Sequence, residues 1–538
     1  MATTNASTTC NSSEQKEEME QKTLKYPIGI QNFQKLREEG FLYVDKTAFV
    51  YQLAQQGGYY FLGRPRRFGK SLLLSTIEAY FEGKKELFEG LAIEKLEKEW
   101  QKYPVLHLDL NASQYRKEED LLQMLNVALV EWEKTYGREA QETTPSTRFA
   151  GIIRRAYKKT GKKVVILVDE YDKPLVMNID DEKQQDTFRD ILKAFYGVMK
   201  SSDQYIRMGF LTGVTKFSKI SVFSDLNNIE DISTDKRYAT ICGMTEEEIH
   251  NNLDSSIAAL AESCGIDKDK CYAELRRRYD GYRFHQDSVG IYNPFSLLLT
   301  ISKQEFGDYW FETGTPTQLI TIITKAGFCI SNLDQAEITS QQMRQSGPIE
   351  NNPLPVLFQS GYLTIKDYDK EFDLYTLGFP NEEVENSFME FLMPLYSNIP
   401  ACTSPFSIQQ FVKEIRNGQP EAFMNRLAAI MADTDYRIVG DSELYFQNFC
   451  YVFFRLLGIY TEVERATNDG RMDMVIRTKD YIYIIEFKLN QTAASALRQI
   501  DEKGYAAPFA ADRRTLYKIG INFNLDKRTI DDWIIEKK

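Results

Sequence analysis

An uninterrupted apolar run ends abruptly in acidic residues in the first third of the chain. Residues 164–168 are Val-Val-Ile-Leu-Val, and Asp169 and Glu170 follow directly. A strand that is apolar at every position is buried on both faces, which is typical of a central strand in a parallel sheet covered by helices. The carboxyl ends of such strands form the edge at which α/β folds bind ligands. The run therefore predicts an α/β fold with a pair of carboxylates at its binding edge.

A second segment, residues 59–74, resembles a phosphate-binding loop between a strand and a helix. Its characteristic residues are Arg66, Arg67, Gly69, Lys70 and Ser71. In such a loop the lysine reaches the β and γ phosphates, the hydroxyl ligates Mg²⁺, and backbone N–H groups surround the anion. The strict pattern is not met, because Arg64 stands where the pattern has glycine and Gly63 comes one position early. Taken alone, the segment is equally compatible with a basic turn before a helix.

The acids that follow the apolar run support the first of these interpretations. Asp169 would hold Mg²⁺ through water, and Glu170 would polarise the water that attacks the terminal phosphate. A later apolar stretch contains Thr212, whose hydroxyl is a candidate sensor of the γ phosphate. A threonine that caps the end of a strand is an equally good interpretation of Thr212. Together, the segments predict ATP and Mg²⁺ as ligands.

Two acids and a lysine lie within a pair of apolar strands near the C-terminus. Asp473 lies in the first strand, and Glu486 and Lys488 alternate around Phe487 in the second. The two-residue period of a strand places Glu486 and Lys488 on one face. Isolated charges in an apolar strand are costly to bury without a partner or a metal, so an ordinary surface hairpin explains the pattern less well. Carboxylates placed in this way can hold Mg²⁺ for phosphodiester hydrolysis, with the lysine orienting water.

This C-terminal region resembles the PD-(D/E)xK restriction-endonuclease-like superfamily from about Asp441 to the end of the chain. The resemblance implies a nuclease in which Asp473 and Glu486 hold the metal and Lys488 orients the water. Positions that commonly support such a site are matched by Glu443, Gln499 and Tyr505. Met472 replaces the proline that usually precedes the first acid, which is a frequent departure in the superfamily.

The N-terminal motifs, taken together, resemble a bacterial AAA-ATPase-like family whose members commonly carry a C-terminal PD-(D/E)xK domain. The similarity begins near Tyr26 and covers nearly the whole chain. It implies a P-loop NTPase parallel sheet, a helical and winged-helix region, and a C-terminal restriction-endonuclease-like α/β domain. The predicted division is a disordered tail at 1–24, a P-loop domain at 25–235, a helical and winged-helix lid or linker at 236–435, and a nuclease-like domain at 436–538.

The winged-helix interpretation depends on residues 354–390, where a helix, a glycine, two short strands and another helix follow one another. The last of these helices, residues 381–390, carries several glutamates. Because glutamates repel nucleic acid, packing over the nucleotide is favoured over DNA binding for this region.

Composition places limits on partners and compartment. No apolar run approaches the roughly 20 residues that span a bilayer, and a secretory signal is not evident, so a cytoplasmic protein without membrane contact is expected. Seven scattered cysteines fit reduced thiols in that compartment. The net charge of −12 argues against a broad nucleic-acid surface, although acids and bases are equal in number from Asp441 to the end of the chain. Candidates for a local basic cleft, with a solvated mixed surface as the alternative, are Arg465, Arg471, Lys479, Arg498, Arg513 and Arg514.

The sequence thus predicts an ATP-binding and ATP-hydrolysing protein joined to a Mg²⁺-dependent nuclease, with nucleic acid, and DNA rather than RNA, as its partner. A homo-oligomer is compatible with this prediction. The main alternative is a signalling ATPase whose C-terminal fold binds nucleic acid or protein without cutting. A nucleotidase or protease-like regulator is a weaker alternative, because no Ser-His-Asp or Cys-His grouping stands out among three histidines.

Overall fold

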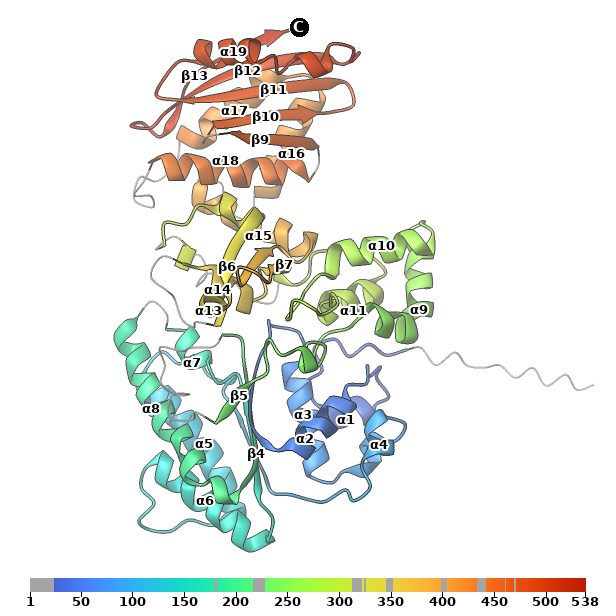
Figure 1. Cartoon of the computed structure of the whole chain (residues 1–538), viewed down its shortest axis with the longest axis vertical. Helices are drawn as coiled ribbons and strands as arrows, with labels where there is room; N and C mark the ends of the chain where they lie inside the picture. Colours follow the sequence, from blue (N-terminus) through green and yellow to red (C-terminus); the bar gives the residue numbers. More distant parts are fainter. Residues whose placement is uncertain are drawn as a thin grey trace, which may run out of the picture.

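Three regions of the chain follow one another along the long axis of the molecule (Figure 1). The computed structural model describes residues 24–178, 181–215, 228–311, 322–323, 326–344, 352–397, 404–432, 442–459, 461–468 and 471–538. The predicted disordered tail, apart from Leu24, lies outside these residues. None of the helices in the described part of the chain combines the length and the apolar composition that crossing a bilayer requires.

A five-stranded parallel sheet forms the N-terminal region, with strands in the order β2-β3-β4-β1-β5. The strands are β1 (Gly58–Gly63), β2 (Val105–Asp109), β3 (Val164–Asp169), β4 (Ile206–Gly213) and β5 (Ile229–Asp231). Every residue of β3 is buried, as the apolar run predicts. Because β4 lies between β1 and β3, the carboxyl ends of these three strands meet at one edge.

Helices cover both faces of this sheet (Figure 1). One face carries α1 (Phe33–Glu38), α2 (Thr47–Gln56), α3 (Lys70–Phe81) and α4 (Ala92–Leu96). The other carries α5 (Glu118–Tyr136), α6 (Pro145–Thr160), α7 (Lys173–Val176) and α8 (Glu182–Ser201). The side chains of β3 alternate between the two cores, with Leu167 on the α3 face and Ile166 on the α5–α8 face. Short 3₁₀ helices lie at η1 (Lys85–Phe88), η2 (Asp203–Tyr205) and η3 (Lys236–Tyr238).

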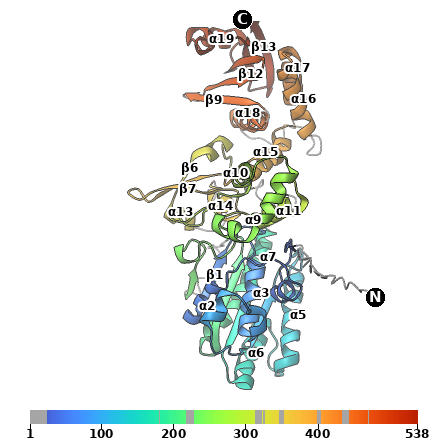
Figure 2. The ribbon, with the colours of Figure 1, turned by 90° about the vertical axis from the view of Figure 1, so that its right-hand side faces the viewer.

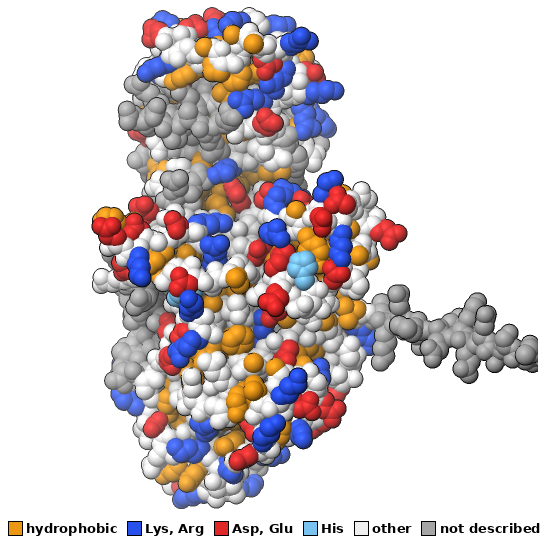
Figure 3. Space-filling model, turned by 45° about the vertical axis from the view of Figure 1, so that its right-hand side comes forward, with side chains coloured by type: hydrophobic (Ala, Val, Ile, Leu, Met, Phe, Trp, Pro, Cys, Tyr) orange, Lys and Arg blue, Asp and Glu red, His pale blue; other side chains and the backbone are white. Residues whose placement is uncertain are grey.

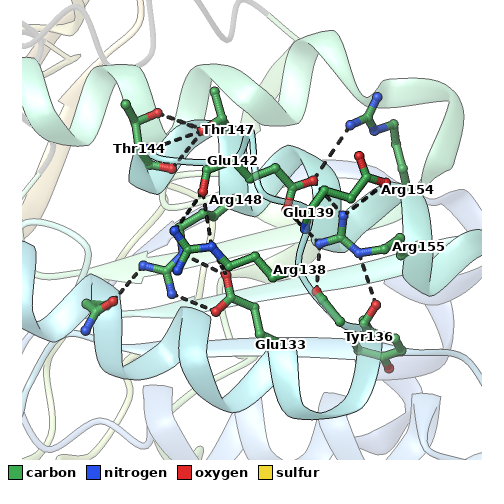
Figure 4. A network of polar contacts seen from close by, with 12 residues as sticks. Glu133, Tyr136, Arg138, Glu139, Glu142, Thr144, Thr147, Arg148, Arg154 and Arg155 are labelled. Atoms are coloured by element: carbon green, nitrogen blue, oxygen red, sulfur yellow. Dashed lines mark hydrogen bonds and ion pairs between the residues drawn. The ribbon is translucent and has the colours of Figure 1, made fainter.

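A buried carboxylate joins α5 to α6 (Figure 4). The side chain of Glu142 is only 3% exposed and accepts two hydrogen bonds from Arg155, at 2.6 and 2.9 Å. Burial alone would raise the pKa of Glu142, but the hydrogen bonds from Arg155 and from the backbone N–H of Glu139 outweigh it and lower the pKa. Gly151 makes room for this carboxylate, because a Cβ there would lie 1.7 Å from Glu142 Oε1.

Replacing Gly151 with alanine is therefore expected to displace Glu142 from Arg155 and to lower the free energy of unfolding by about 2 to 4 kcal/mol, the usual cost of breaking a buried ion pair. Gly197→Ala in α8 is the matched control, since a Cβ there meets nothing within 4 Å. Urea denaturation of both variants measures the difference. Equal stability of the two variants would contradict this account of Glu142.

The middle region is helical around a small antiparallel sheet with the strand order β6-β8-β7. Its first helices are α9 (Glu246–Ser263), α10 (Lys268–Tyr279) and α11 (Pro294–Lys303). They are followed by η5 (Ile330–Gln335), β6 (Ala336–Thr339), α13 (Ser340–Arg344), α14 (Leu354–Gln359), β7 (Thr364–Asp369), β8 (Leu374–Gly378) and α15 (Glu382–Tyr396). The predicted order of helix, strand, strand and helix is present from α14 to α15, while the winged-helix assignment stays a prediction.

The C-terminal region is a mixed sheet in the order β13-β12-β11-β10-β9, in which only β11 and β12 pair in parallel. Its elements are α18 (Ser442–Gly458), β9 (Glu462–Asn468), β10 (Arg471–Arg477), β11 (Tyr481–Leu489), α19 (Ala493–Glu502), η6 (Ala507–Phe509), β12 (Thr515–Asn524) and β13 (Thr529–Lys537). Figure 2 shows α19 on one side of the sheet and α16 (Ser404–Arg416) and α17 (Pro420–Ala432) on the other.

The helices α16 and α17 belong to this sheet, although they precede the predicted domain boundary at residue 436. Tyr483 of β11 donates a hydrogen bond to the carbonyl of Ile415 at 2.6 Å, and Trp533 of β13 donates to Glu421 at 3.3 Å. The fold class itself is confirmed, with a P-loop-like parallel sheet followed by a C-terminal mixed α/β sheet.

Candidate functional site

A cavity of about 490 Å³ lies where the loop after β1, the end of β3 and the middle region meet. The loop contributes Arg66, Arg67, Gly69, Lys70 and Ser71, and the segment after β3 contributes Glu170, Asp172 and Lys173. Backbone near Pro27–Gln31 and the aromatic side chains of Phe295, Trp310 and Tyr362 form the remaining wall. The cavity therefore brings charged and aromatic side chains together, which suits a ligand with a phosphate chain and a flat ring.

Lys70 is held inside the loop that the sequence indicates. Its side chain is 4% exposed, and Nζ donates to the carbonyls of Arg64 at 3.1 Å and Pro65 at 3.3 Å. Glu170 Oε1 lies 3.3 Å from the same Nζ. Gly69 takes a φ of 94° immediately before α3, a conformation that favours glycine. The structure thus brings the loop lysine and the predicted catalytic glutamate together.

Arg64 occupies the glycine position of the strict pattern. Its buried side chain holds the loop against the segments that follow β5. It is 1% exposed and donates to the carbonyls of Gly63, Ser233 and Tyr238 at 2.6 to 3.0 Å. Its guanidinium also lies 4.0 Å from the ring centre of Phe284. Burial lowers the pKa of Arg64 to about 10, so it stays charged at neutral pH. Backbone at Arg64 needs no positive φ, which explains why glycine is dispensable there.

Asp169 and Thr212 form a second contact at the strand ends. The Thr212 hydroxyl donates to Asp169 Oδ1 at 2.5 Å, and both side chains are buried. Because Thr212 is fully buried, its hydroxyl orients Asp169 instead of reaching into the cavity. The hydroxyl of Ser71 and the carboxylate of Asp169 are hard oxygen ligands that fit Mg²⁺.

The sequence motifs did not indicate four residues of this wall, Asn111, Asp172, Lys173 and Thr215. Asp172 accepts hydrogen bonds from the backbone N–H and hydroxyl of Thr215 at 2.7 and 2.8 Å. Burial, with the nearby Glu170 carboxylate, raises the pKa of Asp172 to about 6. Lys173 donates to the carbonyl oxygen of Asn111 at 2.9 Å and to its side-chain oxygen. The only signal in the sequence is that polar residues continue beyond Asp169 and Glu170.

A second cluster of polar side chains lies on β11 and α19. Glu486 and Lys488 are 1% and 7% exposed, and Lys488 Nζ lies 3.0 Å from Glu486 Oε1. The same ammonium donates to Gln499 of α19. The other oxygen of Glu486 is buried and has no hydrogen-bond partner among the described residues. An unpartnered buried carboxylate oxygen is costly, so this atom fits a bound cation such as Mg²⁺.

Asp473 of β10 is directly opposite Glu486 in the antiparallel ladder. The side chain of Asp473 lies outside the described residues, as do those of Arg465 and Arg471. Within the described residues, no group of three or more His, Cys, Asp or Glu side chains is arranged to hold a metal.

Close packing of α19 on the sheet brings Gln499 to Lys488. Gly520 of β12 is the neighbour of Glu486 on the other side, and a Cβ there would lie 2.4 Å from the carbonyl of Ala493 at the start of α19. The absence of a side chain at this position lets the helix approach. Tyr505 packs against the same face.

Glu443 lies on α18, which packs on the opposite face of the sheet. Phe446, one turn later, lies 5.6 Å from the ring centre of Phe487, whose side chain points away from Glu486 and Lys488. Gln447 donates to Glu443 at 3.4 Å. A supporting role for Glu443 therefore stays a prediction.

Among the side chains that the structure describes, the proposed basic cleft is not evident as a continuous surface. Arg514 pairs with Asp512 at 2.6 Å, and Arg477 lies 5.2 Å from the ring centre of Phe509. In Figure 3, basic and acidic side chains are interspersed over the visible face of the molecule. Lys479, Arg498 and Arg513 stay candidates for nucleic-acid contacts.

Two family models match the parts of the chain that contain the two sites. A family described as "Predicted AAA-ATPase" matches residues 27–223, and the PD-(D/E)XK nuclease superfamily matches residues 441–533. The chain is also 37% identical over 523 residues to a protein of Azotobacter chroococcum mcd 1 described as "Uncharacterized protein in vnfD 5'region". That similarity covers 95% of this chain and 99% of the relative. The chain therefore belongs to a family of predicted AAA-ATPase-like proteins that carry a C-terminal domain of the PD-(D/E)XK nuclease superfamily.

Proposed function

We propose that this protein binds and hydrolyses ATP and uses that cycle to control a Mg²⁺-dependent nuclease that cuts DNA. The observation that carries the nuclease assignment is the buried pair of Glu486 and Lys488, which Gln499 contacts from α19. One Glu486 oxygen has no partner among the described residues, and Asp473 is opposite Glu486 in the ladder. Most buried polar atoms in proteins have a hydrogen-bond partner, so this oxygen is a candidate metal ligand.

At the nuclease site, Mg²⁺ bound by Asp473 and Glu486 would supply charge stabilisation on the scissile phosphate and acidify water. Lys488 would orient the attacking water through its ammonium. Gln499 fixes the ammonium by accepting a hydrogen bond from it. Burial of Glu486 and Lys488 excludes bulk water, which strengthens their interactions.

At the nucleotide cavity, Lys70 would bind the β and γ phosphates, and Ser71 and Asp169 would hold Mg²⁺. Lys70 now contacts Glu170 at 3.3 Å. A phosphate that takes the place of this carboxylate would leave Glu170 able to orient the attacking water. Trp310 and Tyr362 would enclose the base, because both are aromatic side chains that line the cavity.

Coupling between the two sites has a continuous route through α15. Near the start of α15, the fully buried Glu383 accepts from the backbone N–H groups of Tyr309 and Trp310 at 2.7 and 2.9 Å. The indole N–H of Trp310 donates to the carbonyl of Arg66 in the phosphate loop at 3.3 Å. Burial raises the pKa of Glu383 to about 7, so this anchor is sensitive to protonation.

The other end of α15 contacts the nuclease domain. Tyr445 of α18 donates to the carbonyl of Tyr396 at 2.6 Å, and Asn448 donates to the Tyr396 hydroxyl at 3.2 Å. The next residue after Tyr445, Phe446, packs against Phe487, which lies between Glu486 and Lys488. A shift of the phosphate loop on binding ATP would thus reach β11 through packed elements.

The test is cleavage of labelled single- and double-stranded DNA and RNA by the purified protein, with and without Mg²⁺ and ATP. We expect Mg²⁺-dependent cutting of DNA that changes in rate with ATP and disappears in Lys488→Ala. Preferential cutting of RNA would overturn the substrate assignment. Binding of nucleic acid without cutting would instead favour the alternative of a non-cutting binding platform.

A further inference from the structure

An excess of positive charge in the nucleotide cavity is not explained by the two motifs. The basic residues that line the cavity are Lys46, Arg66, Arg67, Lys70 and Lys173, and the acidic ones are Glu170 and Asp172. Lys46 is paired with Glu248 at 2.5 Å and Lys70 with Glu170 at 3.3 Å. Among the described residues, Lys173 has no ion-pair partner. A half-buried cation without a counter-ion is a binding site for an anion.

The turn after β3 holds Lys173 beside the predicted catalytic carboxylate. Its backbone N–H donates to the carbonyl of Glu170 at 3.0 Å, which places both residues on one wall of the cavity. The Asn111 carbonyl, just past the neighbouring strand β2, accepts from the ammonium at 2.9 Å. Asn111 is itself fixed, because its backbone N–H donates to Asp109 at 2.7 Å. The ammonium is therefore oriented by neutral acceptors and forms no ion pair among the described residues.

We propose that Lys173, oriented by Asn111, is a catalytic cation that contacts the terminal phosphate of ATP from the Glu170 side of the cavity. This inference rests on the proposed ATPase function. Lys70 lies within the loop that surrounds the phosphate chain, whereas Lys173 stands next to the carboxylate that would orient the attacking water. Charge that develops on the terminal phosphate would thus be neutralised by a residue of the same chain, as a cation supplied in cis does in other phosphoryl-transfer sites.

The physical state of Lys173 is consistent with this role. Burial lowers the pKa of Lys173, and the Arg66 guanidinium contributes to the lowering by repulsion, while the Glu170 carboxylate opposes it. A phosphate anion placed between Arg66 and Lys173 would relieve this repulsion. ADP lacks the terminal phosphate and would gain little from Lys173.

The test compares ATP and ADP binding by calorimetry, and ATP turnover, in Lys173→Ala, Lys173→Gln and Asn111→Ala. For both Lys173 variants we expect ATP affinity to fall about tenfold with ADP affinity unchanged, and the turnover number to fall about 100-fold, since a charge-assisted contact is lost mainly in the transition state. Lys173→Gln keeps a hydrogen-bond donor toward Asn111 and so separates loss of charge from loss of fold. Lys158→Ala, an exposed lysine of α6, is the control.

Asn111→Ala should lower the turnover number less than Lys173→Ala, and the double variant should be no slower than Lys173→Ala, because Asn111 acts through Lys173. Equal losses of ATP and ADP affinity, or unchanged turnover in Lys173→Gln, would overturn the inference. A wild-type protein that binds neither nucleotide would overturn the proposed function, and this inference with it, before any Lys173 variant is considered.

Discussion

Replacing Glu486 with glutamine is expected to reduce Mg²⁺-dependent phosphodiester cleavage by at least about 10³-fold, because the neutral amide is a poor ligand for a hard cation. The substitution keeps the shape of a side chain that is 1% exposed, so the fold should survive. Lys488 would keep its hydrogen bond to Gln499. The measurement is the single-turnover cleavage rate over a range of Mg²⁺ concentrations.

Metal binding gives this prediction a second readout that does not depend on cleavage. A cation that binds the native protein stabilises it, so Mg²⁺ or Mn²⁺ should raise the melting temperature of the wild type but not of Glu486→Gln. Glu502→Gln, an exposed carboxylate at the end of α19, is the matched control and should behave like the wild type. Equal metal-induced shifts in wild type and Glu486→Gln would place the metal elsewhere and refute the site.

The central strand of the P-loop domain could be predicted from the sequence because its signal is local. Residues 164–168 are apolar at every position, and the structure buries each of them. The position of β4 between β1 and β3 could not be predicted in the same way, because the pairing of parallel strands depends on crossovers that are distant in sequence. That pairing is what brings Thr212 to Asp169.

Sequence motifs predicted that Glu486 and Lys488 lie together but not how they are held. The alternation of Glu486 and Lys488 around Phe487 predicted their common face correctly. The contact between Lys488 and Gln499, however, depends on the close approach of α19 that Gly520 permits, and nothing in the sequence near Gly520 indicates it. For Glu443, the spacing in sequence gave no information on which face of the sheet its helix would cover.

Some residues that depart from the motifs, or belong to none, have contacts that are distant in sequence. Arg64 looked like a defect in the phosphate loop, but it is a buried anchor whose partners Ser233, Tyr238 and Phe284 come from distant segments. Lys173 belongs to no motif, because its proposed role depends on Asn111 and on its having no ion-pair partner among the described residues. Such features arise from tertiary contacts, which a single sequence does not display.

Lys70→Ala is expected to weaken ATP binding by about 100-fold, because charge-assisted contacts to two phosphates are removed. If ATP controls the nuclease, the variant should cut DNA at the rate of nucleotide-free wild type whether or not ATP is present. Cleavage assays with and without ATP measure this, and Glu486→Gln, which should bind ATP normally, is the reciprocal control. Equal cleavage by wild type and Lys70→Ala in all conditions would show that the two domains work independently.

Lys70→Ala should also change how the free energy of unfolding depends on pH. Lys70 lowers the pKa of the buried Asp172, which burial and Glu170 raise to about 6. An acid whose pKa is raised in the folded state stabilises the fold at low pH, and this contribution is lost as pH rises through the folded pKa.

In wild type this stabilising contribution of Asp172 is lost between about pH 4 and pH 6. Without Lys70 the pKa of Asp172 rises further, so the decline in unfolding free energy should extend to higher pH. Urea denaturation between pH 5 and pH 8 tests this, and parallel profiles for the two proteins would show that Lys70 and Asp172 do not interact.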